Sequence, residues 1–223
     1  MKYSMMRRIM LPVIFLYMII LTWNYRGAAS VAFGRSLKEL VRIHNPNLVV
    51  LLETRCSGDN AKNVISKLGF PFYHIEEACG FSGGIWIIWR DSDLAIDFLV
   101  SKTQYVHMRI QEGNHASWIF TAIYASPQER VRKQTWRELR NIATNMGEEW
   151  LLAGEFNEII HPLEKKGGGR SDAHACRKFR NWINNCSLMD LRFCGSKFTW
   201  RGPKWEGLER VFKRLDRALS NAS

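Results

Sequence analysis

The sequence predicts an α/β domain in which two packed β-sheets carry helices on their outer faces. Apolar runs typical of strands alternate with segments of helical periodicity, and the middle of the chain holds several strand-like runs without intervening helices. No internal repeat or Pro/Ser-rich linker divides the 223 residues, which indicates a single domain. A hydrophobic content of 46%, with nine Trp and twelve Phe, supports a substantial core and argues against disorder.

The first half of this domain begins with a predicted strand at residues 18–23. Apolar residues then recur at helical spacing from Leu37 to His44, where Pro46 ends the helix. A fully apolar strand follows at Leu48–Leu52, and a second helix covers residues 59–68. This order of elements is typical of a sheet with helices on one face.

The second half opens with strand-like runs separated by turn residues, which we expect to pair antiparallel. These runs are Ile85–Trp89, Leu94–Val100, Tyr105–Ile110 and Trp118–Tyr124. Pro127 suits the first turn of a helix that runs to about Asn145. The remaining predicted elements are a strand at Trp150–Ala153, a helix at Arg177–Asn185 and a strand within Val211–Leu219.

The N-terminus permits two interpretations. Three basic residues precede an uncharged run from Ile9 to Tyr25, which has the length of a short membrane anchor or signal segment. The second half of this run also reads as the first core strand, and one segment cannot be both. We favour the strand, so that residues 1–17 form an N-terminal hydrophobic extension, the domain covers 18–223, and a membrane anchor at residues 9–25 is the minor alternative.

The positive charge is concentrated near the C-terminus. Of a net charge of +11, the segment from Lys165 to Arg217 contributes 14 Lys and Arg against 5 Asp and Glu. Such a segment attracts polyanions through phosphate contacts, although a solvated cationic face has the same composition. Aromatic residues interleave with the basic ones, so they either stack on bases or belong to the core. The candidate nucleic-acid contacts are Lys165, Lys166, Arg170, Lys197, Arg201 and Lys204.

The five cysteines are an odd set without a C-x-x-C pair, which favours a reducing compartment, the nucleus or the cytoplasm. None of them is predicted to bind metal.

Polar residues follow the predicted strands at the points where those strands end. They supply carboxylates, amides and one phenol: Asn24, Glu53, Tyr124, Glu155, Asn157 and Asp216. If these strand ends converge, they form an oxygen-rich pocket that suits a hard divalent cation such as Mg²⁺.

These residues also lie in segments that resemble a known family. Eight segments match, in order, the motifs of plant LINE-type retrotransposon endonucleases of the endonuclease/exonuclease/phosphatase (DNase I-like) superfamily. They are Trp23–Gly27 (W-N-x-R-G), Pro46–Thr54 (P-x-hydrophobic-E-T), Gly80–Trp86 (G-x-S-G-G), Ala122–Pro127 (the Tyr element), Trp150–Glu158 (G-D-F-N), Glu164–Gly169 (the basic glycine loop), Lys197–Trp200 (F-T-W) and Arg214–Leu219 (R-L-D).

The resemblance implies a four-layered α/β sandwich, with two mixed sheets between helices, that hydrolyses DNA phosphodiesters with Mg²⁺ or Mn²⁺. It implies that Glu53 and Asn24 place the metal, and that Glu155 and Asn157 activate the attacking water at the metal. Tyr124 would donate to a phosphate oxygen, and Asp216 would align the catalytic histidine. No stable protein partner is implied.

The sequence departs from the family pattern in two places. Glu155 stands where the family has Asp, and no S-D-H-x-P motif follows Arg214–Leu219, so we expect the last core strand to be lacking. Two hypotheses follow. The chain is either a DNA-nicking endonuclease impaired in this copy, or a catalytically inactive nucleic-acid-binding remnant.

Overall fold

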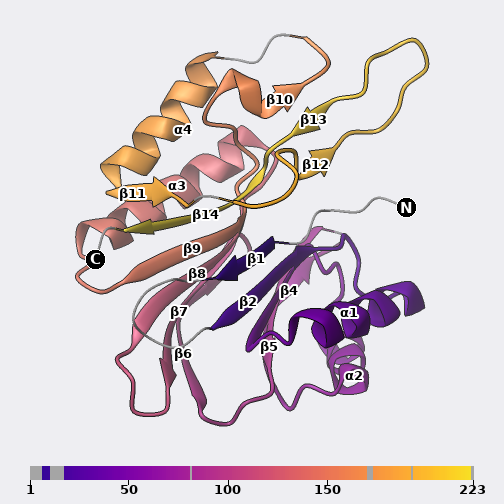
Figure 1. Cartoon of the computed structure of the whole chain (residues 1–223), viewed down its shortest axis with the longest axis vertical. Coiled ribbons are helices and arrows are strands. Elements are labelled where there is room, and N and C mark those ends of the chain that lie inside the picture. The colour runs from indigo at the N-terminus through magenta and orange to yellow at the C-terminus, as the bar shows by residue number, and fades with distance from the viewer. Residues whose placement is uncertain (1–6, 11–17, 81, 170–172, 192, 222–223) are drawn as a thin grey trace.

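The computed structural model describes residues 7–10, 18–80, 82–169, 173–191 and 193–221. Two mixed β-sheets pack face to face (Figure 1). The first has the strand order β1 (Arg7–Met10), β2 (Ile19–Asn24), β3 (Leu48–Leu52), β5 (Ser82–Trp89) and β4 (Phe72–Cys79). The second has the order β11 (Leu188–Asp190), β14 (Asp216–Asn221), β9 (Trp150–Glu155), β8 (Trp118–Tyr124), β7 (Tyr105–Glu112) and β6 (Leu94–Lys102).

Two helices cover the outer face of each sheet (Figure 1). Those on the first sheet are α1 (Val31–His44) and α2 (Gly58–Leu68), and those on the second are α3 (Glu129–Thr144) and α4 (Ala173–Asn185). A small third sheet holds β10 (Lys165–Lys166), β13 (Phe212–Lys213) and β12 (Trp200–Arg201), next to the short 3₁₀ helix Pro162–Glu164. The predicted fold class, an α/β sandwich of two mixed sheets between helices, is confirmed.

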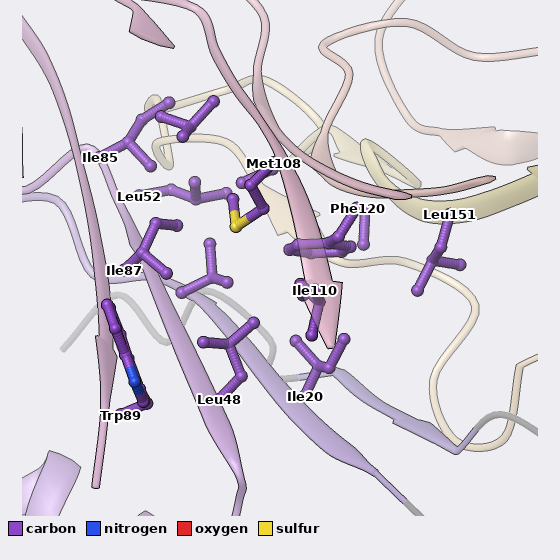
Figure 2. Close-up of a cluster of buried hydrophobic side chains, with 14 of the residues drawn as sticks. Ile20, Leu48, Leu52, Ile85, Ile87, Trp89, Met108, Ile110, Phe120 and Leu151 are labelled. Carbon is purple, nitrogen blue, oxygen red and sulfur yellow. The ribbon is translucent and has the colours of Figure 1, made fainter. Parts of the chain in front are cut away.

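The main core lies between the two sheets (Figure 2). Residues of one sheet, such as Leu48 and Ile87, pack against residues of the other, such as Met108 and Phe120, and all four are fully buried. Strand β3 is apolar at every position because its other face also packs, against α1 and α2. Continuous apolar runs are typical of strands covered on both faces.

The strand directions bring several strand ends to one edge of the sandwich. Strand β2 is parallel to β3, and β8 is parallel to β9, so the carboxyl ends of each pair lie side by side. Strand β14 runs antiparallel to β9, and its first residue, Asp216, pairs with the last residue of β9, Glu155. The edge where these strands end or begin is where the polar residues predicted from the sequence lie.

Two features of the N-terminal sheet differ in detail from the sequence prediction. Part of the segment assigned to an N-terminal extension, Arg7–Met10, forms β1 and pairs antiparallel with β2 as an edge strand. Strand β4 was not predicted, because it is an edge strand whose partly exposed residues include His74 and Glu76 and lack an apolar pattern. The run from Ile9 to Tyr25 contains the buried strand β2. In the part of the chain that the structure describes, no helix is long and apolar enough to cross a membrane.

Candidate active site

The polar residues at the shared edge come from both sheets. Asn24 ends β2, and Glu53 directly follows β3. In the second sheet, Tyr124 pairs with Glu155 in the parallel register, and Asp216 pairs with Glu155 from the other side. All five residues are buried, with at most 8% of their surface exposed. Asn157, two residues beyond Glu155, is partly exposed.

A side-chain hydrogen bond joins the two halves of this edge. Asn24 Nδ2 donates to Glu155 Oε2. Burial raises the pKa of Glu155 above its ordinary value, and the nearby carboxylate of Asp216 raises it further. Two acidic groups that share a buried position disfavour double ionisation, so a cation bound here would favour the ionised form of both.

Glu53 is held by two arginines. Arg26 Nε lies 3.0 Å from Glu53 Oε2, and Arg55 Nη2 forms an ion pair with Glu53 Oε1. Both carboxylate oxygens of Glu53 therefore have a guanidinium partner. Burial raises the pKa of Tyr124, and the charges of Glu53 and Glu155 raise it further, so the phenol stays protonated as a hydrogen-bond donor at neutral pH.

The backbone at this edge has an unusual conformation. Of the six non-glycine residues with positive φ in the described chain, four belong to the loops at this edge: Arg26 (58°), Glu53 (55°), Arg55 (52°) and Asn157 (52°). Left-handed backbone at such residues costs energy and persists where the surrounding contacts impose it. Here the loops are fixed by backbone bonds from Gly27 N to Glu53 O at 3.0 Å and from Ala28 N to Thr54 O at 2.7 Å.

Asn157 and Asp216 are held by contacts outside the cluster of carboxylates. Asn157 Nδ2 donates to Ala125 O at 2.8 Å, and the backbone N–H of Asp216 donates to Thr199 Oγ1 at 3.0 Å. Gly154 has φ +141° and passes so close to β8 that a Cβ there would lie 2.0 Å from Ile123 O. The glycine of the Gly154–Asn157 segment is therefore required by strand packing.

The oxygen donors at this edge fit a hard divalent cation. Asn24 Oδ1 is buried and has no hydrogen-bond partner within the described part of the chain, although Asn24 Nδ2 contacts Glu155. An orphaned amide oxygen beside carboxylates is a donor set that Mg²⁺ accepts, because Mg²⁺ uses one or two carboxylates and keeps several waters. Among the described residues, no group of three or more His, Cys, Asp or Glu side chains could hold a metal ion. A cation at Asn24 Oδ1 would take most of its ligands from water or phosphate oxygens.

The candidate nucleic-acid residues are distributed around the small sheet. Lys165 and Lys166 form β10, Arg201 ends β12, and Lys197 and Lys204 are exposed on either side of β12. Arg170 lies outside the described residues. Gly167, in the basic glycine loop, packs against the segment that precedes β13, where a Cβ would lie 2.2 Å from Arg210 O.

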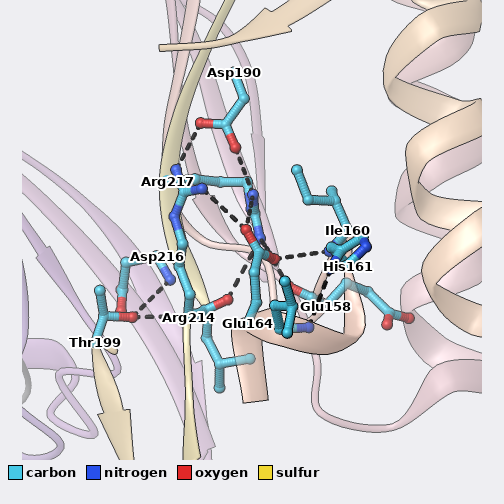
Figure 3. A network of polar contacts seen from close by, with 11 residues as sticks. Glu158, Ile160, His161, Glu164, Asp190, Thr199, Arg214, Asp216 and Arg217 are labelled. Carbon is cyan, nitrogen blue, oxygen red and sulfur yellow. Dashed lines mark hydrogen bonds and ion pairs between the residues drawn. The ribbon is translucent and has the colours of Figure 1, made fainter. Parts of the chain in front are cut away.

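A buried ionic network beside this edge was not predicted from the sequence (Figure 3). Arg214 and Arg217, counted there among the basic surplus, both contact Glu164 and Asp190, at distances from 2.6 to 2.9 Å. Arg217 is fully buried. The charges of these two arginines are thus neutralised inside the protein, and the basic surface is smaller than the sequence suggested.

The fold is shared with solved nuclease structures. No family model and no curated protein matches the sequence. The endonuclease domain of TRAS1, a telomere-specific non-LTR retrotransposon, is 13% identical, with a TM-score of 0.66 over 91% of this chain and 84% of that chain. An AP endonuclease from Leishmania major is 12% identical, with a TM-score of 0.71 over 91% and 78%. The TDP2 protein of D. rerio, solved with a single-strand DNA product, is 12% identical, with a TM-score of 0.57 over 92% and 83%. The chain therefore has the DNase I-like α/β-sandwich fold.

Proposed function

We propose that this chain is a Mg²⁺-dependent phosphodiesterase that nicks DNA, derived from a LINE-type retrotransposon and impaired in this copy. One observation carries the proposal. Asn24, Glu53, Tyr124, Glu155 and Asp216 are buried together at one edge of a DNase I-like fold, where Asn24 Oδ1 lacks a partner in the described chain. Burying carboxylates and an amide oxygen costs free energy unless each is paired, so a buried set with an unpaired oxygen supports a catalytic role.

In this proposal, Asn24 and Glu53 hold Mg²⁺, or Mn²⁺ in its place, with Glu155 and Asn157 on the side of the attacking water. The bound cation supplies charge stabilisation to the phosphate as negative charge develops. A cation at this edge would favour the ionised form of Glu155, and that carboxylate can then accept the proton of the attacking water.

Two further residues act on the substrate or on the geometry. Tyr124 stays protonated and donates a hydrogen bond to a nonbridging phosphate oxygen. Asp216 fixes the position of Glu155 through the adjacent strand and adds negative charge beside it.

DNA is the proposed substrate because the motif pattern resembles LINE endonucleases and because exposed basic residues lie on and beside the small third sheet. Four exposed basic residues lie there: Lys166, Lys197, Arg201 and Lys204. The retrotransposon endonuclease domain and the DNA-bound TDP2 protein among the similar structures are consistent with this choice.

Nicking of supercoiled plasmid tests the proposal. We expect Mg²⁺-dependent conversion to open circles, stopped by EDTA and lost in Glu53→Ala and in the isosteric Glu53→Gln. Glu39→Gln is the matched control, since Glu39 also pairs with an arginine, Arg42, but on the exposed face of α1. Nicking that persists in both Glu53 variants would refute the assigned site.

The alternative is a catalytically inactive nucleic-acid-binding remnant. It is favoured by the glutamate at position 155 and by the two arginines that occupy both oxygens of Glu53. The substitution Glu155→Asp distinguishes an impaired endonuclease from an inactive nucleic-acid-binding remnant. An impaired enzyme gains activity, by up to about 100-fold if the longer side chain displaces the carboxylate by an ångström. A remnant binds DNA in a salt-dependent manner and gains no turnover.

A further inference from the structure

The small sheet arranges its side chains in two rows. In the register of β10, β13 and β12, Lys165 lies directly opposite Lys213, which lies opposite Trp200. The neighbouring row holds Lys166, Phe212 and Arg201. Because successive side chains of a strand point to opposite faces, Lys165, Lys213 and Trp200 share one face and Lys166 lies on the other.

The first row places two like charges side by side. Lys165 and Lys213 are both half-buried, and Lys213 Nζ lies 5.7 Å from the centre of the Trp200 ring. Burial lowers the pKa of Lys213, and the charge of Lys165 lowers it further. Like charges directly opposite each other on paired strands are destabilising, so this row is unfavourable unless an anion lies against it.

No carboxylate in the described part of the chain forms a salt bridge with either lysine, although the charge of Glu158 acts on Lys213. Glu158 is near Lys213, but its Oε1 accepts hydrogen bonds from Arg132 Nε at 3.1 Å and Nη2 at 2.5 Å. Lys165 Nζ donates to the backbone oxygen of Gly169 at 2.5 Å, which leaves its charge uncompensated. Within the same described chain, neither lysine forms a salt bridge.

A further cation on the same hairpin has an unused donor. Arg210 Nε is buried without a hydrogen-bond partner among the described residues, and the backbone oxygen of Arg210 packs against Gly167. The hairpin that carries Lys213 therefore holds a further cation close to the loop that follows Lys165.

This surface borders the candidate active site. Glu158 directly follows Asn157, and Arg132, which binds Glu158, also donates to Ser126 O, two residues beyond Tyr124. Trp200 follows Thr199, whose hydroxyl accepts from the backbone of Asp216. A strand of nucleic acid seated in the active site would have its neighbouring phosphates within reach of this face.

We propose that Lys165 and Lys213 bind one backbone phosphate of the nucleic acid, next to the scissile one, and that Trp200 packs against the adjoining sugar or base. This inference rests on the proposed function, since it assumes a nucleic-acid strand in the site. It assigns to Lys213 a role that the sequence did not suggest, it selects Trp200 among the aromatic residues that interleave with basic ones, and it separates Lys165 from Lys166, which faces the other way.

Binding of a 20-base-pair DNA duplex in EDTA, measured over a range of salt concentrations, tests the phosphate contact. We expect Lys213→Met and Lys165→Met each to weaken binding and to reduce the slope of log K against log salt by about 1. Lys38→Met, on α1 over the other sheet, is the matched control and should leave the slope unchanged. An unchanged slope in Lys213→Met overturns the proposal.

Thermal unfolding without DNA provides a second test, in which the same substitutions that weaken DNA binding should raise the stability of the free protein. Removal of either charge relieves the repulsion between the lysines, so the Tm of Lys213→Met and Lys165→Met should rise by roughly 1–3 °C. Lys166→Met, one residue away on the other face, should show no such rise. A fall in Tm for Lys213→Met would mean that the lysine is a packing residue, and would also overturn the proposal.

These measurements separate the subsite from the catalytic proposal. Neither requires metal or turnover, so the variants can show a phosphate contact even if wild-type protein fails to nick plasmid. Conversely, nicking by wild type together with unchanged salt slopes would retain the nuclease and reject the subsite.

Discussion

Asn24 donates a hydrogen bond to the Glu155 carboxylate and thereby links the last residue of β2 in one sheet to the last residue of β9 in the other. The two residues are 131 positions apart in the sequence. Because both are buried, this contact ties the geometry of the candidate metal site to the packing of the sandwich. Changes at Asn24 should therefore affect stability and metal binding together.

Asn24→Asp is expected to destabilise the metal-free protein by roughly 3 kcal/mol, because a buried carboxylate would face Glu155 without a donor. Saturating MgCl₂ should recover much of this loss, since ligand binding to the folded state stabilises it by mass action. Thermal unfolding with and without MgCl₂ measures both effects. Asn24→Leu, which removes the amide without adding charge, should be destabilised but insensitive to MgCl₂. Equal behaviour of the two variants would argue against a metal at this position.

Arg55→Met is expected to tighten Mg²⁺ binding severalfold. The guanidinium of Arg55 pairs with Glu53 Oε1, so it competes with a cation for the same oxygen. Isothermal titration calorimetry with MgCl₂ measures the change. Arg42→Met removes a similar arginine from the exposed pair with Glu39 and should leave Mg²⁺ affinity as in wild type. Weaker binding in Arg55→Met would show that the arginine supports the metal site instead of competing with it.

Arg217→Met is expected to cost about 3–5 kcal/mol of unfolding free energy. Arg217 is fully buried between Glu164 and Asp190, and of the two arginines that pair with these carboxylates its removal leaves Arg214 (Figure 3). Urea unfolding gives the value. Arg42→Met again serves as the surface control, with an expected loss below about 1 kcal/mol. A loss of similar size in both variants would contradict a structural role for the network.

The positions of the main strands were predictable because burial on both faces leaves apolar runs, as in β3. The residues at their ends followed from the same patterns, since a polar side chain directly after an apolar strand stands out. The residues that pair with these side chains were not predictable from apolar patterns. Arg26 and Arg55 meet Glu53 only because the loops at this edge adopt left-handed backbone at non-glycine positions, which no composition or period reveals.

The charge of a residue in the sequence was the least reliable predictor of its place in the structure. Arg214, Arg217 and Lys213 look alike in the sequence, yet the first two are buried in ion pairs and the third lies beside another lysine. The distinction depends on strand register and on which acidic residues are brought near by distant segments. Glu164 and Asp190 come from two separate parts of the chain.

His107 should make the stability of the protein depend on pH. It is buried in the second sheet, and Nδ1 lies 2.8 Å from Thr121 Oγ1, which also accepts a hydrogen bond from Trp150 Nε1 at 2.8 Å. The Thr121 hydroxyl proton is then available to donate to an unprotonated Nδ1. Burial lowers the pKa of His107 to about 4, and the charge of Arg109 adds to this effect.

The direction of the pH dependence follows from whether the folded or the unfolded protein binds the proton of His107 more readily. Below a pH of about 6.5 the unfolded chain protonates this histidine, whereas the folded protein does so only near pH 4, so stability is lost as pH falls through that window. The full shift corresponds to roughly 3 kcal/mol. Urea unfolding of wild type and His107→Asn at pH 7 and at pH 5 isolates the contribution, since the other titrating groups are common to both proteins. Wild type should lose more stability than the variant between these two pH values. Parallel losses would show that His107 is not held in its neutral form by the fold.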